Sequence, residues 1–442
     1  MQATTIQRSI KSKNRLTNAW AFYDWANSVY PLVITTAVFP IFYENLTSSK
    51  IDGNVVSDSV QFFGTSFINT ELYSYVIALS FLVVSFSSPF LSGIADYTGS
   101  KKMFMRFYCY LGAFSCASLY FFNIENLELS MLSVFFASIG FWGSLVFYNA
   151  FLPEIAPRIE HDRLSAKGYS LGYLGSSILL ILNLMVIMNY DFFGFNNAGE
   201  PTRLAFLSVA IWWIGFSQIT FSRLPDNIYN KKPKGNLVFQ GIKELYRVWL
   251  ELKQNKALKT FLGSFFVYSM GVQTVMLMAV LFASKVINMQ TSSLIISVLI
   301  IQFIGIGGAY FFSWLSSKIG NIKALSTAVF IWILICAGTY YFVYTSVDFY
   351  IVAVTVGLVM GGIQSLSRST YAKMLPETID HASYFSFYEI LEKIGIVIGM
   401  FSFGLIEGIT GSMRNSVLAL IVFFVVGFIL LLRIPGVKAV KH

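Results

Sequence analysis

The amino-acid sequence predicts an all-α integral membrane protein of twelve transmembrane helices, arranged as two six-helix repeats. Its 442 residues are 56% hydrophobic and 12% charged, whereas about a quarter of the residues of a soluble domain are charged. Crossing about 30 Å of hydrocarbon takes roughly 20 apolar residues, and twelve runs of about that length follow one another along the chain. Residues at the end of the fourth run recur at the end of the tenth, which predicts the repeat.

The predicted spans fill most of the chain, and we expect their boundaries to hold within several residues. They cover residues 18–43, 72–94, 103–123, 129–152, 167–189, 204–222, 258–284, 292–315, 324–344, 349–371, 384–409 and 415–432.

The distribution of basic residues predicts the topology. With the N-terminus inside, the outer loops contain only Lys50, Arg203, Lys285 and Arg414, as the preference of Lys and Arg for cytoplasmic loops requires. Both termini are then cytoplasmic, and the first span is expected to insert in the cell inner membrane without a cleaved signal peptide. Topology also explains the net charge of +9, so no nucleic-acid partner is expected.

The middle of the chain is polar and basic. Between Arg223 and Lys259 the Lys and Arg residues far outnumber the three acids, Asp226, Glu244 and Glu251. We therefore expect bundles over residues 1–222 and 258–442, joined by a cytoplasmic linker over 223–257. Apolar residues at helical spacing predict an amphipathic helix from Leu237 to Leu258 lying along that face.

The repeat is visible in short segments. Residues 148–154 (YNAFLPE) match 371–377 (YAKMLPE), and 92–102 (SGIADYTGSKK) has a shorter echo at 317–323 (SKIGNIK). Two repeated six-span halves joined by a basic loop are similar to the architecture of the major facilitator superfamily.

The loop after the second predicted span resembles that superfamily's signature between spans two and three. Asp96, Gly99 and Lys101 match it, whereas Ser92, Tyr97 and Ser100 depart from it. The resemblance implies a latch between the cytoplasmic sides of the two halves. A tight turn with ordinary cytoplasmic lysines is the alternative.

Five segments carry a narrower resemblance, to the vacuole-effluxer-like branch, named for a fungal vacuolar amino-acid exporter linked to autophagy. They are 22–28 (FYDWANS), 152–154 (LPE), 163–175 (RLSAKGYSLGYLG), 361–369 (GGIQSLSRS) and 384–389 (YFSFYE). The resemblance implies a transporter of amino acids or similar metabolites and identifies no single substrate.

Polar residues inside spans are costly, and they mark candidate substrate and proton pathways. In the superfamily, spans one, four, seven and ten line the central cavity. The polar residues at helical spacing on these predicted spans are Asp24, Asn27, Ser28, Trp142, Asn149, Tyr268, Gln364 and Arg368.

Two of these residues carry a charge at neutral pH. Asp24 is a candidate for substrate or proton binding, the alternative being an electrostatic role near the helix start. Arg368 is expected to pair with Asp24 or to bind a solute carboxylate, the alternative being a side chain that extends to the interface.

Span eleven opens with a charged pair at i, i+4 spacing, Glu389 and Lys393, for which we favour a structural or gating role over substrate contact.

Span five contains Gly168, Gly172 and Gly175, which are small residues at helix-packing spacing.

The sequence argues against other classes of function. It has no GxxxxGK[ST] motif for ATP, and His161, His381 and His442 fall in predicted loops or the tail, so we expect no enzyme, metal or other cofactor. We predict a secondary active transporter of a small organic solute by alternating access, with the proton as coupling ion and the lipid bilayer as its surroundings. Efflux of drug-like amphiphiles and a non-transporting receptor are the alternatives.

Overall fold

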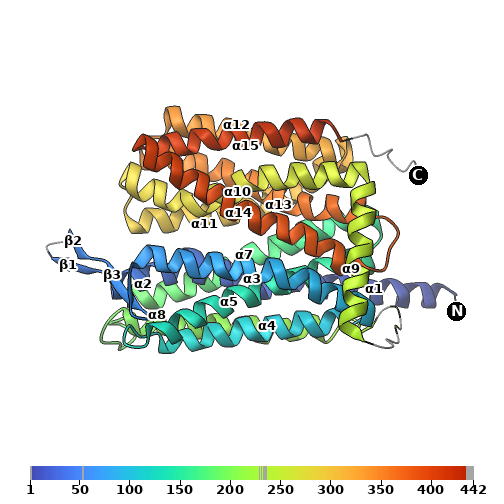
Figure 1. The fold of residues 1–442 in the computed structure, drawn as a ribbon, viewed down its shortest axis with the longest axis horizontal. Coiled ribbons are helices and arrows are strands. Elements are labelled where there is room, and N and C mark those ends of the chain that lie inside the picture. The colour runs from blue at the N-terminus through green and yellow to red at the C-terminus, as the bar shows by residue number, and fades with distance from the viewer. Residues whose placement is uncertain (1, 52–53, 228, 230, 232–235, 435–442) are drawn as a thin grey trace.

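The computed structural model describes residues 2–51, 54–227, 229, 231 and 236–434. It is built almost entirely of helices, most of which run along one axis of the molecule (Figure 1). In chain order the elements are α1 (Gln2–Asn27), η1 (Tyr30–Val38), α2 (Phe39–Thr47), β1 (Ser49–Ile51), β2 (Asn54–Ser57), β3 (Ser59–Phe62), β4 (Thr65–Ile68), α3 (Asn69–Thr98), α4 (Lys101–Ser118), η2 (Leu119–Phe121), α5 (Leu127–Ala150), α6 (Leu152–Ile155), η3 (Arg158–Glu160), α7 (His161–Met188), α8 (Gly199–Phe221), α9 (Leu237–Gln254), α10 (Lys256–Ile287), α11 (Thr291–Ile319), α12 (Asn321–Phe342), α13 (Ser346–Met374), α14 (His381–Thr410) and α15 (Met413–Leu432).

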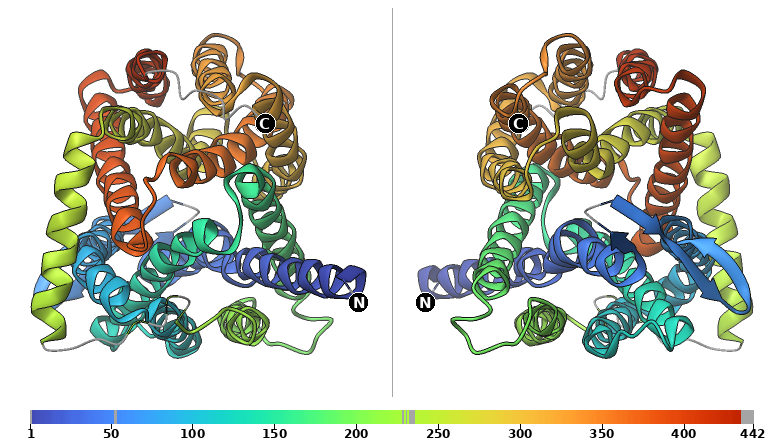
Figure 2. Two further views of the ribbon diagram at one scale, coloured as in Figure 1. Left: turned by 90° about the vertical axis from the view of Figure 1, so that its right-hand side faces the viewer. Right: turned by 90° about the vertical axis from the view of Figure 1, so that its left-hand side faces the viewer.

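The helices form two groups, which we call the N-terminal bundle (α1–α8) and the C-terminal bundle (α10–α15). They meet where α3 packs against α14 and where α7 packs against α11 and α13. Helix α9 runs across the ends of both bundles (Figures 1 and 2), and we call this end of the molecule the α9 end.

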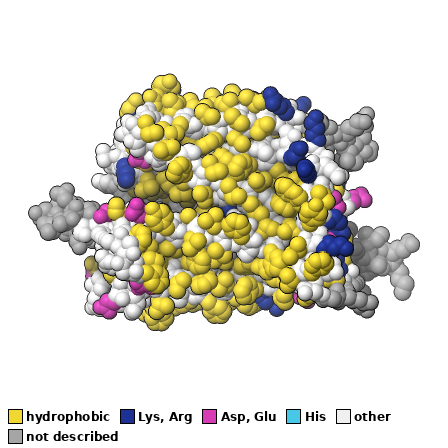
Figure 3. Space-filling view, in the orientation of Figure 1, with side chains coloured by type: hydrophobic (Ala, Val, Ile, Leu, Met, Phe, Trp, Pro, Cys, Tyr) yellow, Lys and Arg dark blue, Asp and Glu magenta, His cyan; other side chains and the backbone are white. Residues whose placement is uncertain are grey.

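Within the described residues, ten helical segments are long and apolar enough to cross a membrane. Helices α4 and α14 pack against these segments but do not meet the same criteria of length, hydropathy and charge. The count of twelve spans therefore stays a prediction. Much of each apolar window faces outward, and hydrophobic side chains cover the middle of the face seen in Figure 3. A lipid environment explains such a surface, because soluble proteins rarely expose apolar patches of this extent.

Glycine ends a helix in both of the segments 92–102 and 317–323. Gly99 follows α3 with φ +73°, and Gly320 follows α11 with φ +88°. Glycine adopts positive φ without the steric cost of a Cβ. The two-repeat arrangement itself stays a prediction.

The first predicted span is longer and less regular than expected. Pro31 lacks an N–H, and the chain forms the π-helix η1 around it, where the Thr35 and Thr36 hydroxyls both donate to the Pro31 carbonyl at 2.7 and 2.8 Å. The loop that follows forms two antiparallel hairpins, β1–β2 and β3–β4, which the sequence analysis did not predict.

The predicted end of the amphipathic helix is wrong. Helix α9 ends at Gln254, and the Asn255 side chain accepts a hydrogen bond from the Leu258 N–H at 3.0 Å, so Leu258 belongs to α10. Asparagine is favoured at this capping position because its side chain satisfies an N–H at the helix start.

Candidate functional site

The centre of the site is an ion pair between the two bundles. Arg368 of α13 donates through Nη1 and Nη2 to the Asp24 Oδ2 of α1, each at 3.2 Å. Arg368 is 2% exposed and Asp24 5% exposed. The guanidinium is therefore buried, and the alternative that it extends to the membrane interface is wrong.

The other donors of Arg368 are also satisfied. Nε donates to the Ser165 hydroxyl at 2.8 Å and Nη2 to the Ser165 carbonyl at 2.9 Å, while Nη1 reaches Asn149 Oδ1 at 3.4 Å. The Tyr148 hydroxyl donates to Asp24 Oδ2 at 2.8 Å. A buried ion pair is tolerable only when such further hydrogen bonds are made.

Aromatic rings and a glycine enclose this pair. The guanidinium carbon lies 4.2 Å from the ring centre of Tyr169 and 5.0 Å from that of Trp20, a favourable arrangement for a cation. Gly168 of α7 leaves room for it, because a Cβ there would lie 2.3 Å from Asp24 Oδ2. The close helix packing predicted from the glycine spacing is confirmed at this point.

A second charged group is connected to the first through Asn149 of α5. Its Nδ2 donates to Glu389 Oε1 of α14 at 2.8 Å. Lys393 contacts Glu389 and lies 3.0 Å from Glu392 Oε2, with its Nζ 4.0 Å from the ring centre of Trp142. We call the connected set Asp24, Arg368, Asn149, Glu389, Lys393 and Glu392 the charge chain.

Three of the predicted gating residues, Asp96, Gly99 and Lys101, lie at the α9 end, whereas Glu389 and Lys393 belong to the charge chain. Asp96, at the end of α3, is fully buried and accepts hydrogen bonds from the Ala382 and Ser383 N–H groups at 3.2 and 2.7 Å. It thus places a carboxylate at the N-terminus of α14, where unpaired N–H groups favour an anion. Gly99 is also constrained, because a Cβ there would lie 2.3 Å from Asn227 Oδ1.

Lys101 extends this contact. Its Nζ lies 3.1 Å from Asp96 Oδ1, forms an ion pair with Glu154 and reaches the Ile379 carbonyl at 3.4 Å. Glu154 Oε1 also lies 3.0 Å from His381 Nδ1. We call Asp96, Lys101, Glu154 and His381 the latch.

The expectation that the histidines lie in loops is wrong for two of them. His161 and His381 are the first residues of α7 and α14 and are buried. His161 Nε2 lies 3.0 Å from the Ala156 carbonyl, and His381 meets Glu154 of the other bundle, contacts that sequence periodicity does not reveal. His442 lies outside the described residues.

The linker covers the latch. The ammonium of Lys101 lies 5.6 Å from the ring centre of Tyr229, and burial raises the pKa of the Tyr229 hydroxyl to about 12. From α9, Arg247 forms an ion pair with Asp380, and Glu251 accepts a hydrogen bond from the Tyr384 hydroxyl at 2.7 Å. The nearby acids raise the pKa of Arg247, although burial acts against them, so it stays charged.

A second polar contact joins the bundles at the same end. Asp162 of α7 accepts from Ser316 at 2.8 Å, from Asn321 at 2.8 Å and from Lys373 at 2.5 Å. Sequence analysis had pointed to the 317–323 echo but had not singled out Asp162. Its position directly before the 163–175 segment was the available signal.

The remaining candidates do not join the charge chain. Asn27 is buried with its Nδ2 unpaired, and Ser28 lies against Gly172. Tyr268 is buried and its hydroxyl lies 2.7 Å from the Ser367 hydroxyl. Gln364 accepts a hydrogen bond from the Tyr173 hydroxyl at 2.6 Å, which adds another contact between the bundles.

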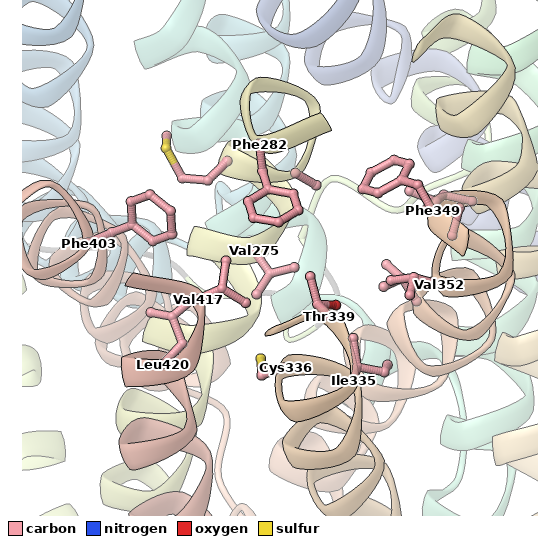
Figure 4. Close-up of a pocket in the computed structure, with 15 residues that line it drawn as sticks. Val275, Phe282, Ile335, Cys336, Thr339, Phe349, Val352, Phe403, Val417 and Leu420 are labelled. Atoms are coloured by element: carbon pink, nitrogen blue, oxygen red, sulfur yellow. The ribbon is translucent and has the colours of Figure 1, made fainter. Parts of the chain in front are cut away.

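A cavity lies elsewhere, within the C-terminal bundle. Its volume is about 40 Å³ and its lining is almost wholly apolar, with Phe282, Phe349 and Phe403 around it and Thr339 among its few polar groups (Figure 4). No member of the charge chain lines it. This cavity is therefore separate from the ion pairs between the bundles.

Comparison with known proteins decides the family. The family described as vacuole effluxer Atg22-like matches residues 12–442. The chain belongs to this family. It is 33% identical over 420 residues to the uncharacterized MFS-type transporter YxiO of Bacillus subtilis, covering 95% of this chain and 94% of the relative.

More distant proteins agree with this assignment. The autophagy-related protein 22 of Eremothecium gossypii is 22% identical over 95% of this chain and 90% of its own length. The solved structure of the major facilitator proton:xylose symporter XylE superposes with a TM-score of 0.71 at 12% identity, covering 96% of each chain. This Atg22-like protein thus has the fold of the major facilitator transporters, a class without enzymes, and the family resemblance drawn from sequence is confirmed.

The geometry draws attention to residues that helical spacing missed. Tyr148 and Glu154 belong to the repeated segment 148–154, and Ser165 belongs to the segment 163–175 that carried the family resemblance. Glu392 opens the predicted span eleven together with Glu389 and Lys393, but the i, i+4 spacing singled out only the latter two.

Proposed function

We propose that this Atg22-like transporter moves a small charged organic solute, an amino-acid-like metabolite, by alternating access coupled to protons. The observation that carries the proposal is the buried Asp24–Arg368 pair, since its two members belong to different bundles. If the bundles separate at the α9 end, this pair must break. A solute carboxylate at Arg368 and a proton on Asp24 would then replace the lost partners.

The orientation proposed for the membrane is that of the positive-inside rule. Lys and Arg side chains gather at the α9 end of the face shown in Figure 3. Helix α1 begins and α15 ends at this end as well (Figure 1). With the α9 end cytoplasmic, both termini lie inside the cell, and the molecule is closed on the cytoplasmic side by the latch and by Asp162.

Alternating access further requires two bodies that rock against each other. We take residues 1–222 and 258–442 as these bodies and α4 and α14 as two of twelve spans. Supporting this, the polar contacts between the bundles are side-chain pairs and N–H groups, which can break and re-form without unfolding a helix.

The charge chain favours a solute that carries formal charge over a drug-like amphiphile, because charged residues inside spans mark pathways for substrates and ions. The apolar cavity in Figure 4 lies apart from this chain, so the proposal does not depend on it.

The test is counter-flow in proteoliposomes that contain the purified protein. Vesicles preloaded with a single unlabelled compound, taken in turn from a panel of amino acids, sugars and an amphiphilic dye, are given a trace of the same compound labelled. We expect transient labelled uptake for amino-acid-like solutes. Uptake confined to sugars or the dye would overturn the proposed solute class, and no counter-flow by any solute would favour a receptor.

A further inference from the structure

The second half of the charge chain has one ammonium for two carboxylates. Lys393 contacts both Glu389 and Glu392. Its side chain is 1% exposed and its ammonium faces the ring of Trp142, so it is enclosed. The two acids must therefore share one positive partner.

The charge chain as a whole is one positive charge short. Asp24, Glu389 and Glu392 are acids, whereas Arg368 and Lys393 are the two bases, which leaves a formal charge of −1. Asp24 pairs with Arg368 and Glu389 pairs with Lys393, which leaves Glu392 as the acid without a base of its own. An uncompensated charge is unfavourable in a low-dielectric interior, so a further positive charge would be bound favourably.

Glu392 is the acid of the charge chain that can bind this additional positive charge. Its side chain is 17% exposed, against 2% for Glu389. Glu389 is also held by Asn149, whereas the second oxygen of Glu392 accepts only from the amide of Gln273 on α10, at 2.8 Å, among the contacts described. Glu392 lies eleven residues after the start of α14, about 16 Å along the helix from the α9 end.

We propose that Glu392 binds one positive charge that the protein carries during its transport cycle, supplied by a coupling proton or by an ammonium group of the solute. The inference rests on the proposed function and names the chemistry of its coupling position. When Glu392 binds this positive charge, Lys393 pairs with Glu389 alone. The formal charge of the charge chain then becomes zero before the bundles rearrange.

The surroundings of Glu392 suit this role. Among the residues that the structure describes, Tyr169 of α7, Tyr268 of α10 and Tyr388 of α14 interact with Glu392, besides Glu389 and Lys393 on its own helix. Phenols in water ionise only near pH 10. These tyrosines supply no positive charge, so a charge from solution is the partner that we propose.

Charge displacement in proteoliposomes adsorbed to a solid-supported membrane tests the proposal. One jump lowers the external pH from 7.5 to 6.5, and another introduces L-lysine at constant pH and ionic strength. A transient current in the pH jump identifies a proton, and one in the lysine jump identifies an ammonium group. We expect Glu392→Gln to reduce the responding current at least tenfold and Glu392→Asp to retain it.

The matched control is Glu377→Gln, which neutralises an exposed acid outside the charge chain and should leave the current unchanged. Because Glu392→Gln removes the surplus charge, it should also melt at the same temperature as the wild type or higher. A current that survives in Glu392→Gln, or no wild-type current in either jump, overturns the proposal. Solute counter-flow without any such current would sink this inference and leave the transport function standing.

Discussion

Asn149 of α5 donates a 2.8 Å hydrogen bond to Glu389 of α14 while its oxygen lies 3.4 Å from Arg368 Nη1. One amide thus connects an ion pair centred on α13 with another on α14. Both of these helices belong to the C-terminal bundle, and Asn149 belongs to the N-terminal bundle. The Asn149 amide can therefore make both contacts only while the two bundles are packed together at this position along the helices.

The first prediction concerns this amide. Asn149→Ala leaves a buried carboxylate oxygen of Glu389 unpaired, at a cost of about 1–3 kcal/mol. We expect a lower melting temperature and transport reduced about tenfold, measured by thermal unfolding and counter-flow. Asn189→Ala, at an exposed position of the opposite end, should change neither, and an unaltered Asn149→Ala protein would show that the connection is unimportant.

The second prediction concerns Asp24. Asp24→Asn cannot release a proton, but it keeps a hydrogen-bond acceptor for Arg368 and Tyr148. We expect accumulation driven by a pH gradient to be lost while passive exchange continues, because exchange needs no net proton movement. Uptake driven by a pH gradient measures accumulation, and counter-flow in the same vesicles measures passive exchange. If the Asp24→Asn protein still accumulates solute, Asp24 is ruled out as a proton site.

The third prediction concerns the latch. Asp96→Asn removes the charge that faces the N-terminus of α14 and that pairs with Lys101. The closed α9 end should become less populated, so transport slows severalfold while solute affinity changes little. Asp191→Asn, an exposed acid at the other end, is the control. A full transport rate in Asp96→Asn would contradict the role of the latch.

The fourth prediction concerns Gly168. A methyl group there would lie 2.3 Å from Asp24 Oδ2 and 2.9 Å from Arg368 Nη2, so Gly168→Ala must displace the ion pair. We expect a lower melting temperature and loss of most counter-flow. Gly215→Ala is the matched control on α8, since its Cβ meets nothing within 4 Å, and it should be neutral or stabilising by about 0.5–1 kcal/mol.

The fifth prediction concerns orientation. Lys285 and Lys323 are exposed at opposite ends of the C-terminal bundle. Single cysteines at these positions should react with an impermeant reagent from outside and inside the cell, respectively. The unsubstituted protein is the control, because its three cysteines are buried. Labelling of both positions in intact cells would show that the topology is wrong.

The sequence by itself determined the membrane class, the family and most helix positions. Apolar runs of fixed length and basic loops are local properties, since each span must satisfy its own backbone hydrogen bonds in lipid. The spacing of Gly168, Gly172 and Gly175 likewise predicted close packing, because a missing side chain is visible in the sequence.

Only the tertiary structure decided which polar residues meet. Asp24 and Arg368 are 344 positions apart. Their pairing was one of several alternatives that the sequence left open, and no periodicity shows that Ser165 and Asn149 complete the hydrogen bonds of Arg368. The same holds for His381, which the sequence placed in a loop and the fold buries against Glu154. Partners in a buried network are set by how two bundles dock, and docking depends on the shape of whole helix faces, which helical spacing along a single span does not contain.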